Sequence, residues 1–252
     1  MNKYDVIIIG AGPSGIFCAY ELMRQKPDMK VLMIEKGRSI EKRQCPKRTT
    51  KVCVGCKPCS ITTGFAGAGA FSDGKLSLSP DVGGTLPEIL GYEKAEELIK
   101  EADNIYLKFG ADEKVYGIDD YEAIERIRAK AIRANLKLIE CPIRHLGTEE
   151  GYKIYTRLQE HLLASGVEIK FMTMVQDIII EDGVAKGVVT DKEETYYADE
   201  IVSGIGREGS SWFEGICKNH GIKTQNGTVD VGVRVEVRDE IMKELNEKLY
   251  EA

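Results

Sequence analysis

The stretch Tyr4–Glu35, YDVIIIGAGPSGIFCAYELMRQKPDMKVLMIE, decides the fold. A short apolar run leads into the glycine turn Gly10–Gly15, a helical pattern follows, and a second apolar run ends in Glu35. This order of strand, glycine turn, helix, strand and acid is typical of the unit that binds the ADP half of a dinucleotide. The sequence therefore predicts a dinucleotide-binding unit at the start of an α/β fold.

Each residue type in the glycine turn has a physical reason to be there. Gly10 permits the tight turn out of the strand, Gly12 leaves room for the pyrophosphate, and Gly15 lets the helix pack closely on the strand. Pro13 suits the first helical position, and the N–H groups that follow it, beginning with Ser14, face the phosphates. Glu35 lies where a carboxylate accepts hydrogen bonds from ribose hydroxyls, which argues against a 2′-phosphate and hence against NADP at this site. An ordinary glycine-rich turn would leave this acid unexplained.

Composition excludes several classes of protein. The 252 residues are 42% hydrophobic and 30% charged, with a net charge of −6. The length allows one large domain or two small ones, and the charge gives no broad basic surface for nucleic acid. No run of 18 apolar residues predicts a membrane span. The first strand contains Asp5 and shows no cleavage site, so we expect no signal peptide and a cytoplasmic location.

Two details of the fingerprint point to the kind of dinucleotide. The GAGPSG turn and the segment IEKG, which ends the second strand and includes Lys36, resemble the two-dinucleotide-binding-domain flavoproteins related to glutathione reductase. In those proteins the N-terminal fingerprint holds FAD. The resemblance implies a Rossmann-like parallel sheet that binds FAD, an antiparallel β-meander and an inserted substrate region. The turn after the meander, with Gly204 and Gly206, would then lie close to the cofactor.

The rest of the chain fits that order of elements. Periodicity predicts helices over 92–109, 120–133 and 151–165, a strand over 167–173, and a hairpin formed by 175–180 and 184–189. A short strand over 195–197 and an apolar run at 201–202 follow. The alternating valines of Val229–Val237 predict a strand that leads into a helix over 240–250.

Four cysteines follow the second strand with the spacing C-x7-C-x2-C-x2-C; they are Cys45, Cys53, Cys56 and Cys59. Close spacing lets thiolates converge on one metal centre, and seven basic residues between Arg38 and Lys57 would stabilise an anionic site. Three interpretations stay open, which are an iron–sulfur cluster, a structural zinc, and no metal. The last of these includes a redox-active dithiol.

A second glycine-rich segment, TTGFAGAGAFSDGKLSL at 62–78, follows the cysteines. Its glycines allow backbone N–H groups to approach a ligand, and its phenylalanines are unlike those of a flexible linker. We therefore predict a flavin or substrate loop, with Gly67, Gly69 and Ser72 near the cofactor.

Together with the cysteines, this segment resembles a group of uncharacterised bacterial and archaeal FAD-dependent dehydrogenases. That resemblance implies FAD and redox chemistry, and it leaves the substrate open. This chain has Ala66 where the first glycine of GGAG is expected.

Catalytic candidates are few. His145 lies in a loop before a helix and is the best acid/base candidate, and Lys75 lies close to the presumed flavin loop. Arg144 could bind an anionic substrate or face solvent. Neither a Ser/His/Asp arrangement nor an HExxH motif is present.

The sequence as a whole predicts an FAD-dependent oxidoreductase that transfers hydride or electrons to or from a small molecule or a redox partner protein. NAD(P)H is a candidate electron donor. We expect an FAD-binding domain over 1–90 and 150–215, and a substrate region, shortened relative to the family, over 91–149 and 216–252. The alternatives are an NAD-dependent dehydrogenase and a cofactor-binding fragment that needs a partner chain.

Overall fold

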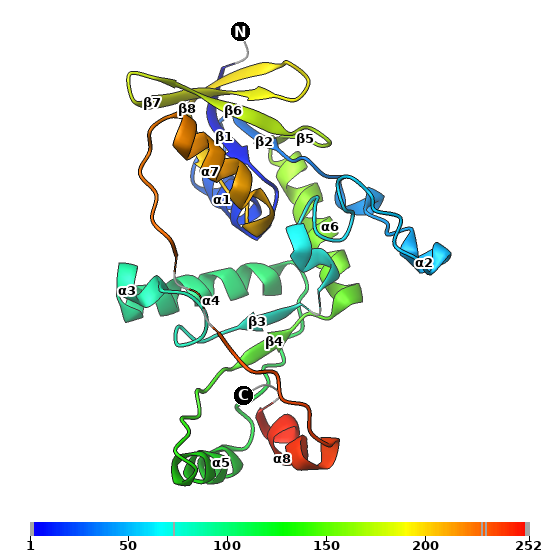
Figure 1. The fold of residues 1–252 in the computed structure, drawn as a ribbon, viewed down its shortest axis with the longest axis vertical. Helices are drawn as coiled ribbons and strands as arrows, with labels where there is room; N and C mark the ends of the chain where they lie inside the picture. The colour runs from blue at the N-terminus through cyan, green and yellow to red at the C-terminus, as the bar shows by residue number, and fades with distance from the viewer. Residues whose placement is uncertain (1–2, 73, 228, 230, 250–252) are drawn as a thin grey trace. The chain divides into compact units, whose positions relative to one another are not determined.

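The computed structural model describes residues 3–72, 74–227, 229 and 231–249 (Figure 1). The chain forms two compact units. Unit 1 comprises Met1–Ser72 and Gly151–Gly227, and unit 2 comprises Asp73–Glu150 and Thr228–Ala252. Residues 73–90 fall in unit 2 and not with the fingerprint, because Lys75–Ser77 pairs with Ile143–His145. Residues 216–227 fall in unit 1, where Ile216 is part of the hydrophobic core.

Unit 1 is built on a six-stranded sheet in the order β5-β2-β1-β8-β7-β6. Its strands are β1 (Lys3–Ile9), β2 (Val31–Ile34), β5 (Glu168–Lys170), β6 (Val175–Glu181), β7 (Val184–Thr190) and β8 (Thr195–Ser203). β5, β2, β1 and β8 run parallel, and β8, β7 and β6 form the antiparallel meander. The predicted α/β fold with a Rossmann-like sheet and meander is confirmed.

The apolar runs of β1 and β2 form central strands because both of their faces are covered. Ile7 and Ile9 belong to a core cluster that also holds Val188 of the meander and Ile216 of α7 (Ser210–Asn219). On the other face, the Cγ2 atom of Ile8 lies next to the start of α1 (Pro13–Gln25). The helix α6 (Thr148–Ala164) contributes the fully buried Ile154, Leu158 and Leu162.

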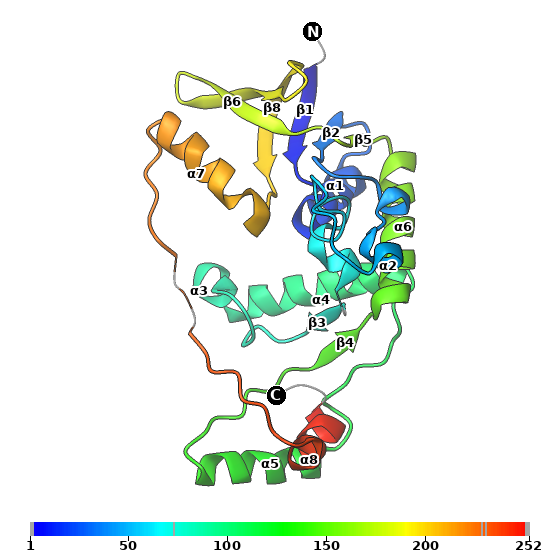
Figure 2. The ribbon, with the colours of Figure 1, turned by 45° about the vertical axis from the view of Figure 1, so that its right-hand side comes forward.

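β8 is one strand where the sequence suggested two short pieces. Its first residues pair with β7, as in Val189 with Thr195, and its later residues pair in parallel with β1, as in Ile9 with Ser203. This strand therefore carries the chain from the meander back to the fingerprint (Figure 2).

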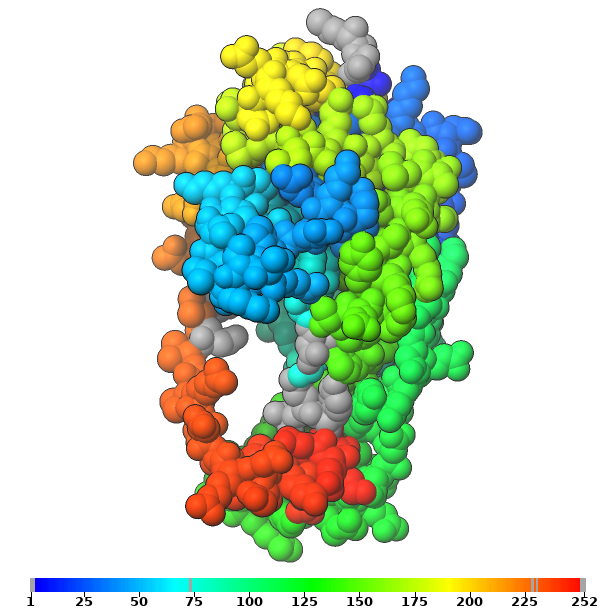
Figure 3. All heavy atoms as spheres, turned by 90° about the vertical axis from the view of Figure 1, so that its right-hand side faces the viewer, coloured from blue at the N-terminus to red at the C-terminus, as the bar shows by residue number. Residues whose placement is uncertain are grey.

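The remaining elements of unit 1 are short. They are η1 (Ile40–Lys42), α2 (Lys47–Thr50), η2 (Gly67–Phe71) and η3 (Arg207–Gly209). The segment between β2 and η2 lies on the surface beside α6 (Figure 3), where the N–H of Ile40 donates to Gln159 Oε1 at 3.0 Å.

Unit 2 contains four helices and a two-stranded sheet among the described residues. The helices are α3 (Leu86–Leu90), α4 (Tyr92–Lys108), α5 (Tyr121–Arg133) and α8 (Asp239–Leu249), and the strands are β3 (Lys75–Ser77) and β4 (Ile143–His145). α5 and α8 bury Ile124, Ile127 and Leu249 against each other. Asp120 caps α5 by accepting from the N–H of Ala123 at 3.0 Å.

Apart from β8, three predicted elements differ from the structure by more than one residue. α6 begins at Thr148 and not at residue 151, and β5 covers only three of the seven residues expected. The predicted strand Val229–Val237 is wrong over its described part, because residues 231–237 form no strand and their valines are exposed, Val231 by 94%. Residue 230 lies outside the described residues.

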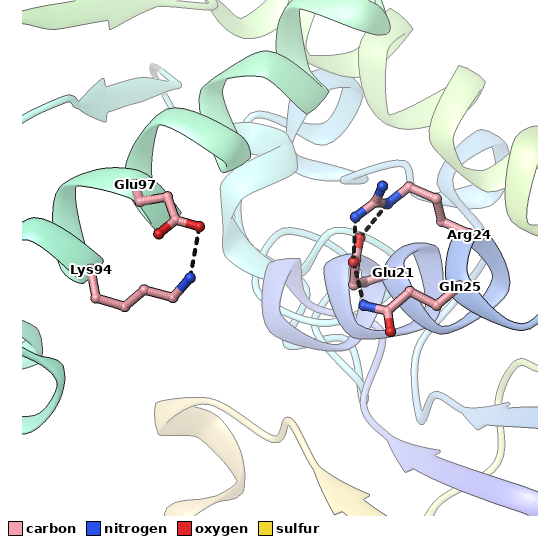
Figure 4. Close-up of polar contacts among 5 residues, drawn as sticks. All are labelled: Glu21, Arg24, Gln25, Lys94 and Glu97. Carbon is pink, nitrogen blue, oxygen red and sulfur yellow. Dashed lines mark hydrogen bonds and ion pairs between the residues drawn. The ribbon is translucent and has the colours of Figure 1, made fainter.

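Exposed ion pairs lie on the surface of both units. In α1, Arg24 Nη2 lies 2.7 Å from Glu21 Oε1, and in α4, Lys94 Nζ lies 2.7 Å from Glu97 Oε1 (Figure 4). Each such pair contributes less than about 1 kcal/mol. Among the described residues, no helix combines the length and apolar character that a membrane crossing needs.

Candidate functional site

A cavity of about 610 Å³ opens in unit 1 where β1, β2 and β8 end. Five segments line it. They are the fingerprint turn, the end of β2, the loop 62–68, the start of β6, and the chain from Gly204 into α7. The carboxyl ends of parallel strands are the usual ligand sites of open α/β sheets, and the volume suits a small molecule or cofactor.

The glycines of the fingerprint are needed for close backbone approach. Gly10 has φ +96°, and a Cβ on it would lie 2.8 Å from the carbonyl oxygen of Gly204. A Cβ on Gly15 would lie 2.1 Å from the carbonyl oxygen of Gly10. Gly12 differs, since its nearest neighbour would be 3.9 Å away and it lines the cavity. Two of the three glycines hold the backbone together, and the third keeps the cavity open.

The N-terminus of α1 points its positive end at this space. Pro13 occupies the first turn, Gly12 provides no side-chain cap, and no acid lies in that turn. Both Pro13 and Ser14 line the cavity. Because neither a capping side chain nor an acid lies at this end of α1, its first N–H groups and the helix dipole suit an anion such as a phosphate.

Glu35 is 6% exposed and supports the turn directly. Its Oε2 accepts from the N–H of Ala11 at 2.8 Å, and its Oε1 accepts from the N–H of Gly37 at 2.7 Å. Because a carboxylate has about four acceptor positions, these two hydrogen bonds leave part of the acceptor capacity of Glu35 unused. The residue lines the cavity, as its position after β2 predicted.

The second glycine-rich segment forms one wall of the cavity. The N–H of Ala66 donates to the carbonyl of Ala11 at 2.7 Å, and a Cβ on Gly67 would lie 3.5 Å from Gly12 Cα. Ala66 itself has φ +69°, a conformation that glycine adopts more easily, so the departure from GGAG coincides with a left-handed residue.

The structure brings most of the predicted cofactor residues to one cavity and leaves three outside its lining. Those that line it are Gly10, Gly12, Pro13, Ser14, Glu35, Lys36, Gly67, Gly204 and Gly206. Gly15 acts in packing, as described. Gly69 lies against α6, where a Cβ would meet the Tyr155 hydroxyl at 3.4 Å, and the Ser72 hydroxyl donates to the carbonyl of Gly69 at 3.0 Å.

Sequence reasoning missed the apolar part of the lining. Met174 directly precedes β6, Val175 begins that strand, and Trp212 comes from α7. The indole N–H of Trp212 donates to the carbonyl of Gln176 at 2.9 Å, which holds the ring beside the meander. Because Trp212 is the single tryptophan of the chain, its rarity was the one signal available.

Two charged residues meet at the cavity. Lys36 forms an ion pair with Glu208, and both line the space. Burial lowers the pKa of the Lys36 ammonium below its ordinary value. The pair therefore connects the end of β2 with η3.

The cysteine segment does not gather into a metal centre. Among the described residues no group of three or more His, Cys, Asp or Glu side chains is placed to hold a metal ion. Cys53 and Cys59 are exposed, and Cys45 and Cys56 are partly buried. Hydrogen bonds from the backbone of Thr62 and Ile61 lower the pKa of the Cys59 thiol. In this structure the four cysteines are thus not gathered around one point, and an iron–sulfur cluster or zinc stays a prediction.

The two catalytic candidates lie on neighbouring strands of unit 2. Lys75 and His145 are direct partners in the antiparallel β3–β4 pair. Their neighbour Arg144 is structural, because its Nη2 donates to Asp103 Oδ2 at 2.8 Å and its side chain is 5% exposed.

Two family models match parts of the chain. One, described as pyridine nucleotide-disulphide oxidoreductase, matches residues 122–242, and the other, described as Thi4 family, matches residues 1–41. The chain is also 52% identical over 33 residues to a thiamine thiazole synthase of Coprinopsis cinerea, which is 13% of this chain and 10% of that protein.

Solved structures share the fold over most of the chain. L-amino acid deaminase from Proteus vulgaris matches with a TM-score of 0.50 and 14% identity, over 88% of this chain and 50% of that one. A 3-ketosteroid dehydrogenase from Rhodococcus jostii matches with a TM-score of 0.50 and 18% identity, over 80% and 45%. The chain thus spans about half the length of these proteins. The solved structures confirm the fold, and the model that matches residues 122–242 describes an oxidoreductase family.

Proposed function

We propose that this chain binds FAD in the cavity of unit 1 and belongs to an FAD-dependent oxidoreductase. One observation carries the proposal. The fingerprint turn, Glu35, the glycine-rich loop and the turn after β8 are far apart in sequence and line a single cavity. A dinucleotide needs these features together, whereas a structural glycine turn needs no open space.

The chemistry of the lining suggests which residues would contact each part of the nucleotide. Gly12 and the N-terminus of α1 would hold the pyrophosphate through backbone N–H groups. Glu35 would accept from ribose hydroxyls with the acceptor positions that its backbone contacts leave free. Met174, Val175 and Trp212 form an apolar surface that suits the adenine ring.

The bound flavin would supply hydride or electron transfer, and the protein would supply binding, orientation and electrostatics. The substrate is a small molecule or a redox partner protein, and NAD(P)H is a candidate electron donor. The matched family of pyridine nucleotide-disulphide oxidoreductases supports that donor. The cysteines enter no step of this proposal.

The test is reconstitution. The purified chain is incubated with FAD, desalted, and examined by visible absorption before and after anaerobic addition of NADH or NADPH. Retained flavin bands that bleach with one of the two nucleotides support the proposal. A folded protein that retains no flavin and binds NAD⁺ instead favours the NAD-dependent alternative.

A further inference from the structure

A buried arginine lies directly behind the cavity wall. Arg43 follows η1 and is 2% exposed. Its Nε donates to the carbonyl of Ser60 at 3.0 Å, its Nη2 to the carbonyl of Ile61 at 2.7 Å, and its Nη1 to the carbonyl of Phe65 at 2.5 Å. A buried charge is stable only where hydrogen bonds compensate for the loss of water. The three carbonyls supply those hydrogen bonds and so fix the position of the guanidinium relative to residues 60–65.

The residues that bear these three carbonyls flank, in sequence, a stretch that lines the cavity. Thr62, Thr63 and Gly64 lie between Ile61 and Phe65, and all three line the space. The guanidinium therefore forms hydrogen bonds on both sides of this short stretch. Lysine could not replace it, because a point donor cannot reach three carbonyls in a fixed planar arrangement.

Two neighbouring residues, Gly64 and Phe71, also pack against the Arg43 side chain. Gly64 has φ +125°, and a Cβ there would lie 2.7 Å from Arg43 Cδ, so only glycine lets the side chain pass. The guanidinium also lies 4.7 Å from the centre of the Phe71 ring. Beyond the wall, the N–H of Ala66 bonds to Ala11 of the fingerprint.

We propose that Arg43 is a positioning residue of the nucleotide cavity, because it holds residues 60–65, which form one wall of that cavity, in place. The inference rests on the proposed FAD site. Loss of the guanidinium releases the wall, and the ordering of residues 62–64 must then be supplied by the cofactor's own binding energy. Affinity for FAD falls for that reason, although Arg43 need not touch the cofactor.

The experiment compares three variants by FAD titration and by thermal unfolding without FAD. Arg43→Met keeps the aliphatic stem and removes all donors, and Arg43→Lys keeps the charge. Arg48→Met is the matched control, because Arg48 is exposed and stands over the same Phe71 ring at 5.8 Å. We expect the Kd for FAD to rise at least tenfold in Arg43→Met, less in Arg43→Lys, and not in Arg48→Met.

Chemical rescue separates positioning from general loss of stability. Millimolar guanidinium, well below denaturing concentrations, should restore part of the FAD affinity of Arg43→Met and leave Arg48→Met unchanged. Wild-type affinity in Arg43→Met would overturn the inference while the FAD proposal stood. Absence of FAD binding by the wild type would instead refute the proposed function.

A measurement on the wild type decides the question if the Arg43 variants do not fold. The Nε–H of Arg43 should exchange slowly with solvent by ¹⁵N NMR, since it donates to Ser60 and is buried. Exchange as fast as that of Arg48 would contradict the inference.

Discussion

Two alanine substitutions three residues apart should separate cofactor binding from folding. In the free protein, Gly12→Ala places its methyl group in the open cavity, 3.9 Å from the nearest neighbour. The backbone of Gly12, with φ −75° and ψ 178°, is available to alanine. The loss of a good N-cap residue costs roughly 0.5–1 kcal/mol, and the lower chain entropy of the unfolded state returns a similar amount. We expect the stability of the free protein to change little.

The effect of Gly12→Ala on FAD should be large. The new methyl group occupies the space that the pyrophosphate needs, and overpacking of this kind costs about 1–3 kcal/mol. That range corresponds to a rise of roughly 5- to 150-fold in the Kd for FAD.

Gly15→Ala is the counterpart. Its Cβ would lie 2.1 Å from the carbonyl oxygen of Gly10, and a backbone atom cannot move aside as a side chain can. We expect a loss of about 3 kcal/mol or more in the free protein, equivalent to a fall of roughly 6–12 °C in the unfolding temperature.

Circular dichroism melts of the free proteins and flavin fluorescence titrations provide both quantities. An unfolding temperature that falls as far in Gly12→Ala as in Gly15→Ala would contradict the assigned roles of these glycines. Binding of FAD by Gly12→Ala as tightly as by the wild type would contradict them as well.

Three further predictions concern other parts of the chain. Asp103→Ala leaves a buried arginine partner unpaired in unit 2 and should cost about 3–5 kcal/mol in urea unfolding, whereas Glu97→Ala on the exposed face of the same helix should cost under 1 kcal/mol. Cys59, whose thiol pKa is lowered by backbone hydrogen bonds, should be alkylated by iodoacetamide near pH 7 before Cys18, whose thiol pKa is raised by burial; equal labelling in peptide mass spectrometry would refute this. Hydrogen bonding by Arg24 lowers the pKa of the Glu21 carboxyl to about 2, so its small stabilising effect should be present above pH 4.5 and disappear as the pH falls toward 2; NMR titration with an ordinary pKa would contradict it.

The fingerprint could be predicted because its determinants are local. Gly10, Gly12 and Gly15 act within one turn, and Glu35 follows at a fixed spacing, so the pattern alone specifies which residues meet. The resemblance to flavoproteins added the turn at Gly204, which the structure places against Gly10.

The remaining part of the site depends on contacts that no local pattern records. Trp212 joins the cavity because α7 packs beside the meander, and Arg43 acts on carbonyls 17 to 22 residues away. Backbone carbonyls leave no mark in the sequence, so neither role was visible there.

The wrong strand prediction has a related cause. Val231, Val233 and Val235 alternate as strand residues do, yet they are 94%, 88% and 72% exposed. A strand also requires a neighbouring edge to pair with, and within the described residues this segment has no strand partner. Alternation shows which residues could share a face, and pairing depends on the fold around them.

The central claim is that the cavity of unit 1 holds FAD. Titration of the purified, folded chain with FAD, with NADP⁺ in a parallel series, tests it most directly through quenching of flavin and Trp212 fluorescence. We expect saturable binding of one FAD per chain, quenching of the single tryptophan, which lines the cavity, and much weaker binding of NADP⁺. A folded chain that does not bind FAD, or that binds NADP⁺ more tightly, would contradict it.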